Sequence, residues 1–340
     1  MRTAKNLILT LTITAVCIIL ALHIGSVKVS VEDIFKVIFM GGKGLPSSTT
    51  TIILKLRLPR ILLAFLVGGS LSLAGCVLQG ILRNPLADPY IIGASSGASV
   101  GAGFSIILLA ELNIGMNNLF GLGMTPIFAF VGSILTVLLV YRVSKVGNTV
   151  PIVTLLLAGI ATSTILSAVM SLMLYFSDDI VQPLVYWLMG SFNARTWIHV
   201  ITILPYPLIG FIIIYKKAVI LDIFAMGESK AKQLGVNVEK EKKLLLIVSA
   251  FLTAAAVSMC GIIGFVGLLI PHLIRLIYGP NNKQLTWRSL IWGGNFLIIA
   301  DTLARTILSP TELPVGIITS LCGGPFFIYL LKKQQGKYWQ

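Results

Sequence analysis

The stretch from Leu244 to Tyr278 reads LLLIVSAFLTAAAVSMCGIIGFVGLLIPHLIRLIY, 35 nearly continuous apolar residues. As one helix it would reach about 52 Å, far more than a hydrocarbon core of about 30 Å. Glycines at 261, 264 and 267 offer a place to turn. We therefore predict two membrane spans here, and the number of times the chain crosses the membrane depends on this division.

The composition of the whole chain agrees with a membrane protein. Hydrophobic residues make up 56% and charged residues 11% of the 340 residues, whereas a soluble domain carries roughly 25% charge. Segments of the required length, about 20 apolar residues, recur throughout. We predict an all-α polytopic membrane protein, a single domain over residues 1–340 with about ten transmembrane helices. The expected spans lie at about 6–27, 58–82, 89–110, 124–141, 150–176, 197–215, 243–263, 264–279, 288–308 and 313–331.

The basic residues predict the orientation. With the N-terminus in the cytoplasm, 18 of the 26 Lys and Arg residues fall in inner segments, as the positive-inside rule requires. Merging residues 244–278 into one span would move Lys332, Lys333 and Lys337 outside. We expect a multi-pass protein of the cell (inner) membrane with both termini cytoplasmic. The net charge of +14 thus reflects orientation and contact with lipid, and we expect no nucleic-acid partner.

The N-terminal span has no cleavage signal after it. Arg2 and Lys5 precede an apolar run, as in a signal peptide, but no A-x-A site follows. We therefore expect this segment to remain as the first span.

Residues that would support catalysis or metal binding do not cluster. The four cysteines show no CxxC spacing and the three histidines no HExxH spacing, so we expect no metal site and no cofactor. His272 has no ionisable residue spaced to relay a proton with it, and we expect it to be structural. The sequence has no GxxxxGK[ST] loop, so ATP hydrolysis would need a separate chain. We expect no enzyme activity.

Two hydrophilic regions on the predicted outer face carry helical signals. Residues 31–39 have the apolar spacing of a short helix lying on the membrane surface. The stretch 180–195 is too short to cross and has polar ends. It predicts a partial helix that dips in from the outer face, where neighbouring protein can satisfy its backbone.

The longest predicted cytoplasmic segment is 216–243. Within it, Gly227 can end one short helix, and Glu228 to Leu234 can form a second helix with Gly235 as its cap. Such a helix suits docking of a cytoplasmic partner. An ordinary basic loop beside anionic lipid explains the same residues equally well.

Residues 73–99 read LAGCVLQGILRNPLADPYIIGASSGAS. The dipeptides Asn84-Pro85 and Asp88-Pro89 are typical turns at the inner mouth of two spans. Glycines at 93, 97 and 101 give the following helix a smooth face for close packing.

Arginines stand at the outer ends of two spans. Arg57 and Arg60 open the second span, and Arg305 closes the ninth. Such residues often reach toward lipid phosphates, but guanidinium forks also bind carboxylates of a docking protein. Asp301 lies one turn before Arg305 and can pair with it.

These segments together resemble the FecCD family, the permease subunits of ABC importers for ferric siderophores, haem and cobalamin. The similarity runs in order from about residue 57 to 331. The segments that carry it are RLPR (57–60), residues 73–99, WLMGS (187–191), QLGV (233–236), GFVGLLIPHLIR (264–275), ADTLAR (300–305) and ELPVG (312–316).

The resemblance implies a type II ABC importer permease architecture, in which two permeases pair around a pathway on their two-fold axis. It implies coupling to cytoplasmic ABC ATPase subunits through residues 222–236, and docking of an extracytoplasmic substrate-binding protein at the three arginines. It also implies an inner gate at the turn after residue 83 and, less distinctively, at 146–149. The residues concerned are Gly227, Glu228, Lys230, Ala231, Leu234 and Gly235 for coupling, Arg57, Arg60 and Arg305 for docking, Asn84, Leu86, Asn148 and Thr149 for the gate, and Trp187 and Gly190 for the outer mouth.

The expected cargo is a ferric siderophore, with haem or cobalamin as the alternatives. The second permease can be another copy or a homologous chain. An ion-coupled secondary transporter is the rival from a different class, and it predicts carboxylates near the midplane and broken helices. All twelve acidic residues can be placed at or near span ends, which disfavours that rival.

Overall fold

The computed structural model describes residues 2–25, 27–111, 122–176 and 181–338, and in these ranges the protein is helical, with one isolated bridge between Val146 and Thr149 as its only β-type pairing. The all-α prediction is confirmed. The helices at the predicted spans are α1 (Arg2–His23), α4 (Leu58–Leu82), α5 (Ala94–Glu111), α6 (Met124–Val143), α7 (Ile152–Tyr175), α9 (Trp197–Ile203) with α10 (Pro205–Lys216), α13 (Val238–Cys260), α14 (Val266–Tyr278), α15 (Asn282–Ala304) and α16 (Val315–Tyr338). The shorter elements are α2 (Val31–Met40), α3 (Ser47–Thr51), the π-helix η1 (Ile52–Arg57), the 3₁₀-helix η2 (Pro89–Ile92), α8 (Val181–Leu188), α11 (Ala218–Ala225) and α12 (Glu228–Gln233).

Length and composition make several of these helices suited to a membrane. Within the described ranges, five segments are long and apolar enough to cross, and four shorter helices are also apolar. The long ones are Ser47–Leu82, Met124–Val143, Ile152–Tyr175, Trp197–Lys216 and Val238–Cys260. The chain is therefore a multi-pass, membrane-type helical protein.

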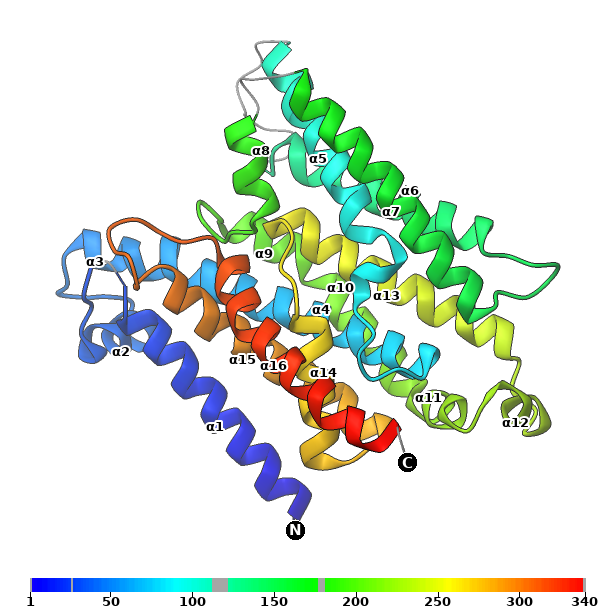
Figure 1. Cartoon of the computed structure of the whole chain (residues 1–340). Coiled ribbons are helices and arrows are strands. Elements are labelled where there is room, and N and C mark those ends of the chain that lie inside the picture. The colour runs from blue at the N-terminus through cyan, green and yellow to red at the C-terminus, as the bar shows by residue number, and fades with distance from the viewer. Residues whose placement is uncertain (1, 26, 112–121, 177–180, 339–340) are drawn as a thin grey trace.

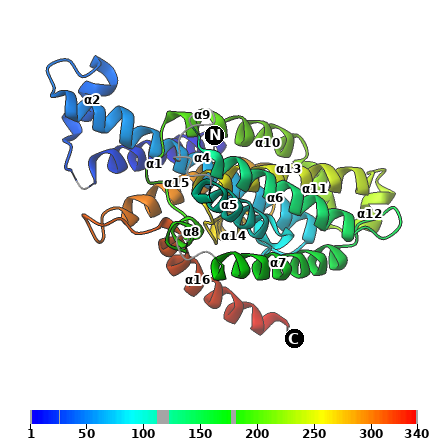
Figure 2. The ribbon, with the colours of Figure 1, turned by 90° about the horizontal axis from the view of Figure 1, so that it is seen from above.

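The two ends of the bundle carry different elements. Figure 1 shows the start of α1, the end of α16 and α12 at one end, which we call the inner end, and α2 and α8 at the opposite, outer end. Figure 2 shows α2 extending beyond the rest of the helices. The predicted surface helix is thus present as α2, with Ile34 and Val37 buried and Phe35, Ile38 and Phe39 exposed.

Helix α4 is the centre of the packing. It is buried along most of its length and contacts α13, α14 and α15. A Cβ added to Gly68 would lie 2.1 Å from the carbonyl oxygen of Gly293, and one added to Gly75 would lie 1.7 Å from that of Gly267. Small residues therefore let these backbones approach closely, as in other membrane helix pairs. The glycine face predicted on α5 is confirmed in the same way, because a Cβ on Gly97 would lie 2.4 Å from the Gly132 oxygen on α6.

The division of residues 244–278 occurs at the predicted glycines but differs in form from two complete helical spans. Helix α13 ends at Cys260, and the chain is non-helical from Gly261, with φ +76°, to Phe265, with φ +68°. The 13 residues of α14 extend only about 20 Å. Since that is shorter than the hydrocarbon core, the non-helical segment must complete the crossing.

Candidate functional site

At the outer end, two arginines bind the last carbonyls of α1. Arg57, at the end of η1, donates from Nη1 to the oxygen of Leu22 and from Nη2 to that of Val27. Arg305, the C-cap of α15, donates to the oxygen of Ala21. The final carbonyls of a helix have no partner within it and attract cations. Both side chains are buried, with 6% and 5% of their surface exposed.

The third arginine binds carboxylates. Arg60, in the first turn of α4, lies 2.8 Å from Oδ1 of Asp301 and 2.9 Å from Oε2 of Glu312. The Asp301 side chain is 2% exposed and that of Glu312 is 34% exposed. Asp301, which can pair with Arg305 one turn away on the sequence evidence, instead forms its ion pair with Arg60, which helix α4 brings to this carboxylate. The structure thus gathers all three predicted docking residues at one end, around the end of α1.

The residues predicted for the outer mouth lie where three chain segments meet. The predicted partial helix is present as α8, and its residue 180 lies outside the described part of the chain. Gly190, with φ +70°, accepts a 3.0 Å hydrogen bond from the amide of Val315 at the start of α16. A Cβ on Gly261 would lie 2.0 Å from the oxygen of Trp187. The end of α8 therefore packs directly on the non-helical segment that follows α13.

That segment is tied to η2 as well. The Tyr90 hydroxyl donates to the oxygen of Ile263 at 2.9 Å and accepts from its amide at 3.2 Å. Non-helical backbone in a membrane is tolerated where protein covers it. Here α8, η2 and α16 provide that cover.

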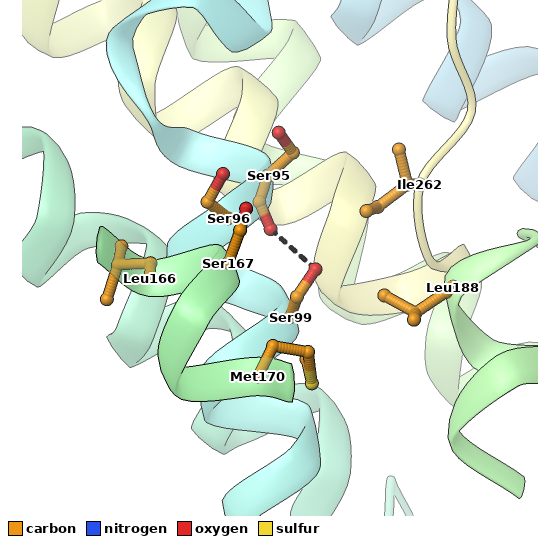
Figure 3. Close-up of a pocket in the computed structure, with 8 residues that line it drawn as sticks. All are labelled: Ser95, Ser96, Ser99, Leu166, Ser167, Met170, Leu188 and Ile262. Carbon is orange, nitrogen blue, oxygen red and sulfur yellow. Dashed lines mark hydrogen bonds between the residues drawn. The ribbon is translucent and has the colours of Figure 1, made fainter. Parts of the chain in front are cut away.

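Beside the mouth lies a cavity of about 250 Å³ lined by four serines, Ser95, Ser96, Ser99 and Ser167. Figure 3 shows these serines on α5 and α7, with Leu188 and Ile262 opposite them. One of the hydroxyls, on Ser99, donates to the oxygen of Ser95 at 2.9 Å, and the lining contains no charged residue. Such a surface offers weak, neutral hydrogen bonds and apolar contact. None of the four serines was predicted from the sequence, although Ser95, Ser96 and Ser99 stand beside the glycines of the GASSGAS stretch.

A larger hollow of about 580 Å³ separates α8 from the loop before α16. Its lining includes Gln182 and Tyr186 from α8 and Glu312 from the loop. Glu312 therefore belongs both to the Arg60 ion pair and to the wall of this hollow. The arginine cluster and the outer mouth are neighbouring parts of one surface.

At the inner end, α12 is a short capped helix. The predicted helix from Glu228 is present, and Gly235, with φ +79°, follows its C-cap. The amide of Gly235 donates to the carbonyl oxygen of Lys232, and that of Val236 to the carbonyl oxygen of Ala231, each at 3.0 Å. This is the Schellman pattern. Ala231 is fully buried, so this side of the helix packs against the bundle.

Exposed basic side chains lie on α12, and exposed apolar side chains lie directly before and after it. Met226 and Leu234 are each 62% exposed, and Lys230 and Lys232 are exposed. Met226 and Leu234 thus leave large apolar side chains exposed on either side of α12.

The two predicted gate turns lie at the same end. Asn84 follows Arg83, the left-handed C-cap of α4, and its side-chain oxygen accepts from the Leu86 amide at 2.9 Å. The second turn is a tight hairpin closed by two hydrogen bonds between Val146 and Thr149, 2.9 and 3.1 Å long. Its Gly147 has φ +59°, as the first central position of a two-residue hairpin requires. Asn148, beside this glycine, is exposed.

The fold defines a polytopic helical membrane protein, and proteins of known structure share it. A solved ABC transporter assigned to the metal-chelate type, in an inward-facing conformation, matches with a TM-score of 0.84 and 32% identity over 97% of this chain and 99% of that one. The cobalamin import system permease protein BtuC of Halobacterium salinarum is 43% identical over 292 residues, 86% of this chain and 76% of that protein. The hemin transport system permease protein HmuU of Yersinia pestis is 39% identical over 287 residues, 83% of each chain. The FecCD transport family profile matches residues 13–333, and the chain belongs to this family.

Proposed function

We propose that this chain is the membrane-spanning subunit of an importer for ferric siderophores, powered by ATP hydrolysis on a separate chain. Two permeases, identical or homologous, would enclose the pathway on their two-fold axis. Membership of the FecCD family supports this role. The cytoplasmic side is then the inner end, which agrees with the excess of basic residues expected there.

The observation that carries the proposal is the form of α12. A basic loop held only by anionic lipid would use its lysines and would need no fixed helix. Here Ala231 and the Schellman pattern hold α12 in place, while Met226 and Leu234 remain exposed. A fixed helix with exposed lysines and with these two apolar side chains beside it fits a groove on an ATPase subunit, in the manner of other helix-in-groove contacts.

The neutral serine cavity supports a bulky chelate as cargo. A pathway that must release its cargo gains nothing from tight ligands, and hydroxyls with apolar neighbours bind weakly. Ferric siderophore is the proposed cargo because a transporter assigned to the metal-chelate type is similar to this chain. Haem is one alternative, favoured by the similarity to the hemin permease HmuU. Cobalamin is a second candidate, favoured by the 43% identity to BtuC.

The arginine cluster at the outer end is the proposed dock for a substrate-binding protein. Arg60 is the residue best placed for this, since the partly exposed Glu312 can yield to a carboxylate of that protein. Guanidinium groups bind carboxylates strongly and with defined geometry. Arg57 and Arg305 would have to exchange their bonds to α1 before they could take the same role.

The proposed mechanism is alternating access. ATP closes the two ATPase subunits, and the docked α12 helices convert this closure into movement of the bundle. The turns at Asn84–Leu86 and Val146–Thr149 would then open or close the inner gate, while Trp187 and Gly190 line the outer mouth.

Reconstitution with the cognate ATPase and binding protein tests the proposal. We expect uptake of a siderophore loaded with radioactive iron to require ATP and to stop when the ATPase is inactivated. Uptake that continues without hydrolysis would contradict an ABC importer. Uptake of cobalamin in place of the siderophore would select the second candidate.

Removing residues 228–234 should uncouple hydrolysis from uptake while the protein remains in the membrane. Unchanged coupling in that variant would show that α12 has another role.

A further inference from the structure

Lys242, on α13 at the inner end, is a buried lysine with three acceptors. Its side chain is 3% exposed. The ammonium nitrogen lies 2.8 Å from Glu228, 3.4 Å from Glu239 and 3.0 Å from the carbonyl oxygen of Val150. A buried charge is stable only when it is paired and hydrogen-bonded, and an ammonium has three donors. The three oxygens match that need, so Lys242 cannot move away from one of them without cost.

The three acceptors belong to three different parts of the inner end. Glu228 is the first residue of α12, Glu239 lies in the first turn of α13, and Val150 directly follows the hairpin turn Val146–Thr149. Glu239 also accepts a 3.1 Å hydrogen bond from the Val150 amide. Lys242 and Glu239 therefore hold both backbone polar groups of Val150.

The start of α12 also lies against the other turn. Nη1 of Arg83 lies 3.6 Å from the position that a Cβ on Gly227 would occupy. Arg83 directly precedes Asn84. The residues at which α12 begins are thus adjacent to both predicted gate turns, although the hairpin turn is far from them in sequence.

We propose that Lys242 is the positioning residue that transmits displacement of α12 to the turn at 146–149. This inference rests on the proposed function, in which α12 docks on an ATPase and the turn belongs to the inner gate. Breaking a buried ion pair leaves an uncompensated charge. When the ATPase shifts α12, Glu228 therefore carries Lys242 with it, and Lys242 carries the backbone of Val150. A role confined to fastening α12 to the bundle would predict no effect of Lys242 on the turn during the ATP cycle.

The test uses the full chain with its ATPase in lipid nanodiscs. The four native cysteines are replaced by serine or alanine, and Asn148→Cys supplies one reporter in the turn. The rate at which a membrane-impermeant maleimide modifies this cysteine is measured without nucleotide and with ATP trapped by vanadate. In the parent chain we expect the two rates to differ at least about fivefold, the lower end of typical coupling between sites.

In Lys242→Met this difference should disappear while the ATPase still co-elutes with the chain. Lys242→Arg keeps the charge and the donors and should restore part of the difference. Glu228→Ala removes the acceptor on α12 and leaves Lys242 paired with Glu239 and Val150, so it cuts only the link to α12. It should also lose the difference, and it decides the question if Lys242→Met does not fold.

Lys217→Met is the matched control. Lys217 forms a 2.6 Å ion pair with Glu241 on α13, and that pair includes no residue of α12 or of the turn. This variant should keep the full rate difference.

Two results would overturn the inference in distinguishable ways. A full rate difference in folded Lys242→Met, with the ATPase bound, would refute the role of Lys242 and leave the proposed function intact. No rate difference in the parent chain, or no association with the ATPase, would refute the proposed function and the inference with it.

Discussion

The three arginines of the outer end and the lysines of α12 at the inner end differ in what they contact. At the outer end, Arg57 and Arg305 donate hydrogen bonds to carbonyl oxygens of α1, and Arg60 forms ion pairs with two carboxylates. At the inner end, Lys242 is buried beneath α12, while the lysines on α12 itself are exposed. Counting charges on each side of a membrane predicts orientation, but it does not tell which charges hold the fold and which face a partner.

The difference implies different requirements for binding. At the inner end, the exposed side chains on and beside α12 can bind a partner without any internal bond being broken. At the outer end, the guanidinium groups must first give up their internal hydrogen bonds and ion pairs. Three tests, made with four substitutions and two controls, examine this contrast, beginning with the one expected to have the largest effect.

Asp301→Asn should destabilise the protein most. The buried carboxylate compensates Arg60, and its loss leaves that guanidinium with Glu312 alone near two further arginines. Removing one partner of a buried pair typically costs about 3 to 5 kcal/mol. Thermal unfolding in mixed micelles measures the loss.

The control for Asp301→Asn is Glu32→Gln, which breaks the exposed 2.6 Å pair with Lys36 on α2. Exposed pairs contribute little, so its unfolding midpoint should not change. Equal stability of the two variants would show that the outer cluster does not hold the fold.

Arg60→Gln and Glu312→Gln remove the same ion pair from its two sides. If the outer end must release Arg60 before docking, Arg60→Gln should weaken association with the binding protein about tenfold, and with less dependence on salt. Glu312→Gln frees the guanidinium and should strengthen association. Surface plasmon resonance at two salt concentrations measures both, and weakening by Glu312→Gln would mean that Arg60 acts only within the ion cluster.

Gly235→Ala should have the smallest effect, confined to α12. Nothing lies within 4 Å of the added Cβ, so the cost is the left-handed backbone itself, about 1 kcal/mol. Amide hydrogen exchange of residues 228–233 should accelerate roughly fivefold.

Gly264→Ala adds a Cβ in equally open space without a positive φ, so it should leave this exchange unchanged. A similar acceleration in both variants would show that the inner end is less rigid than its hydrogen bonds indicate.

Hydropathy and length predicted the helices well because each span must satisfy its own backbone. Local rules also located α2 from its apolar spacing, α8 from its short length and polar ends, and α12 from Gly235 as its cap. The division at Gly261 followed from the length of the apolar run and from the glycines within it.

Contacts between distant segments could not be read in this way. The partner of Asp301 is 241 residues away in sequence, on α4, whereas the sequence indicated Arg305 on the same helix. Lys242 was counted as an ordinary inner basic residue, because its burial depends on α12 and the turn before α7. The serine cavity needs α5, α7 and α8 together, and hydroxyls among glycines give no signal of a shared cavity.

The broken path at Gly261–Phe265 is a feature that the rival secondary transporter also predicted. It therefore does not distinguish the two classes, and family membership decides for the ABC permease. An interrupted helix therefore fits a transport pathway of either mechanism.

The same break has a consequence for how the protein is made. Residues 261–265 leave the ribosome before α16, whose first residues pack against the oxygens of Met189 and Ile262. Until that last helix arrives, the interruption lacks part of its cover in the bilayer. A chain truncated before residue 315 would thus lose this cover, and the carbonyl oxygen of Gly190 would lose the Val315 amide as its hydrogen-bond donor.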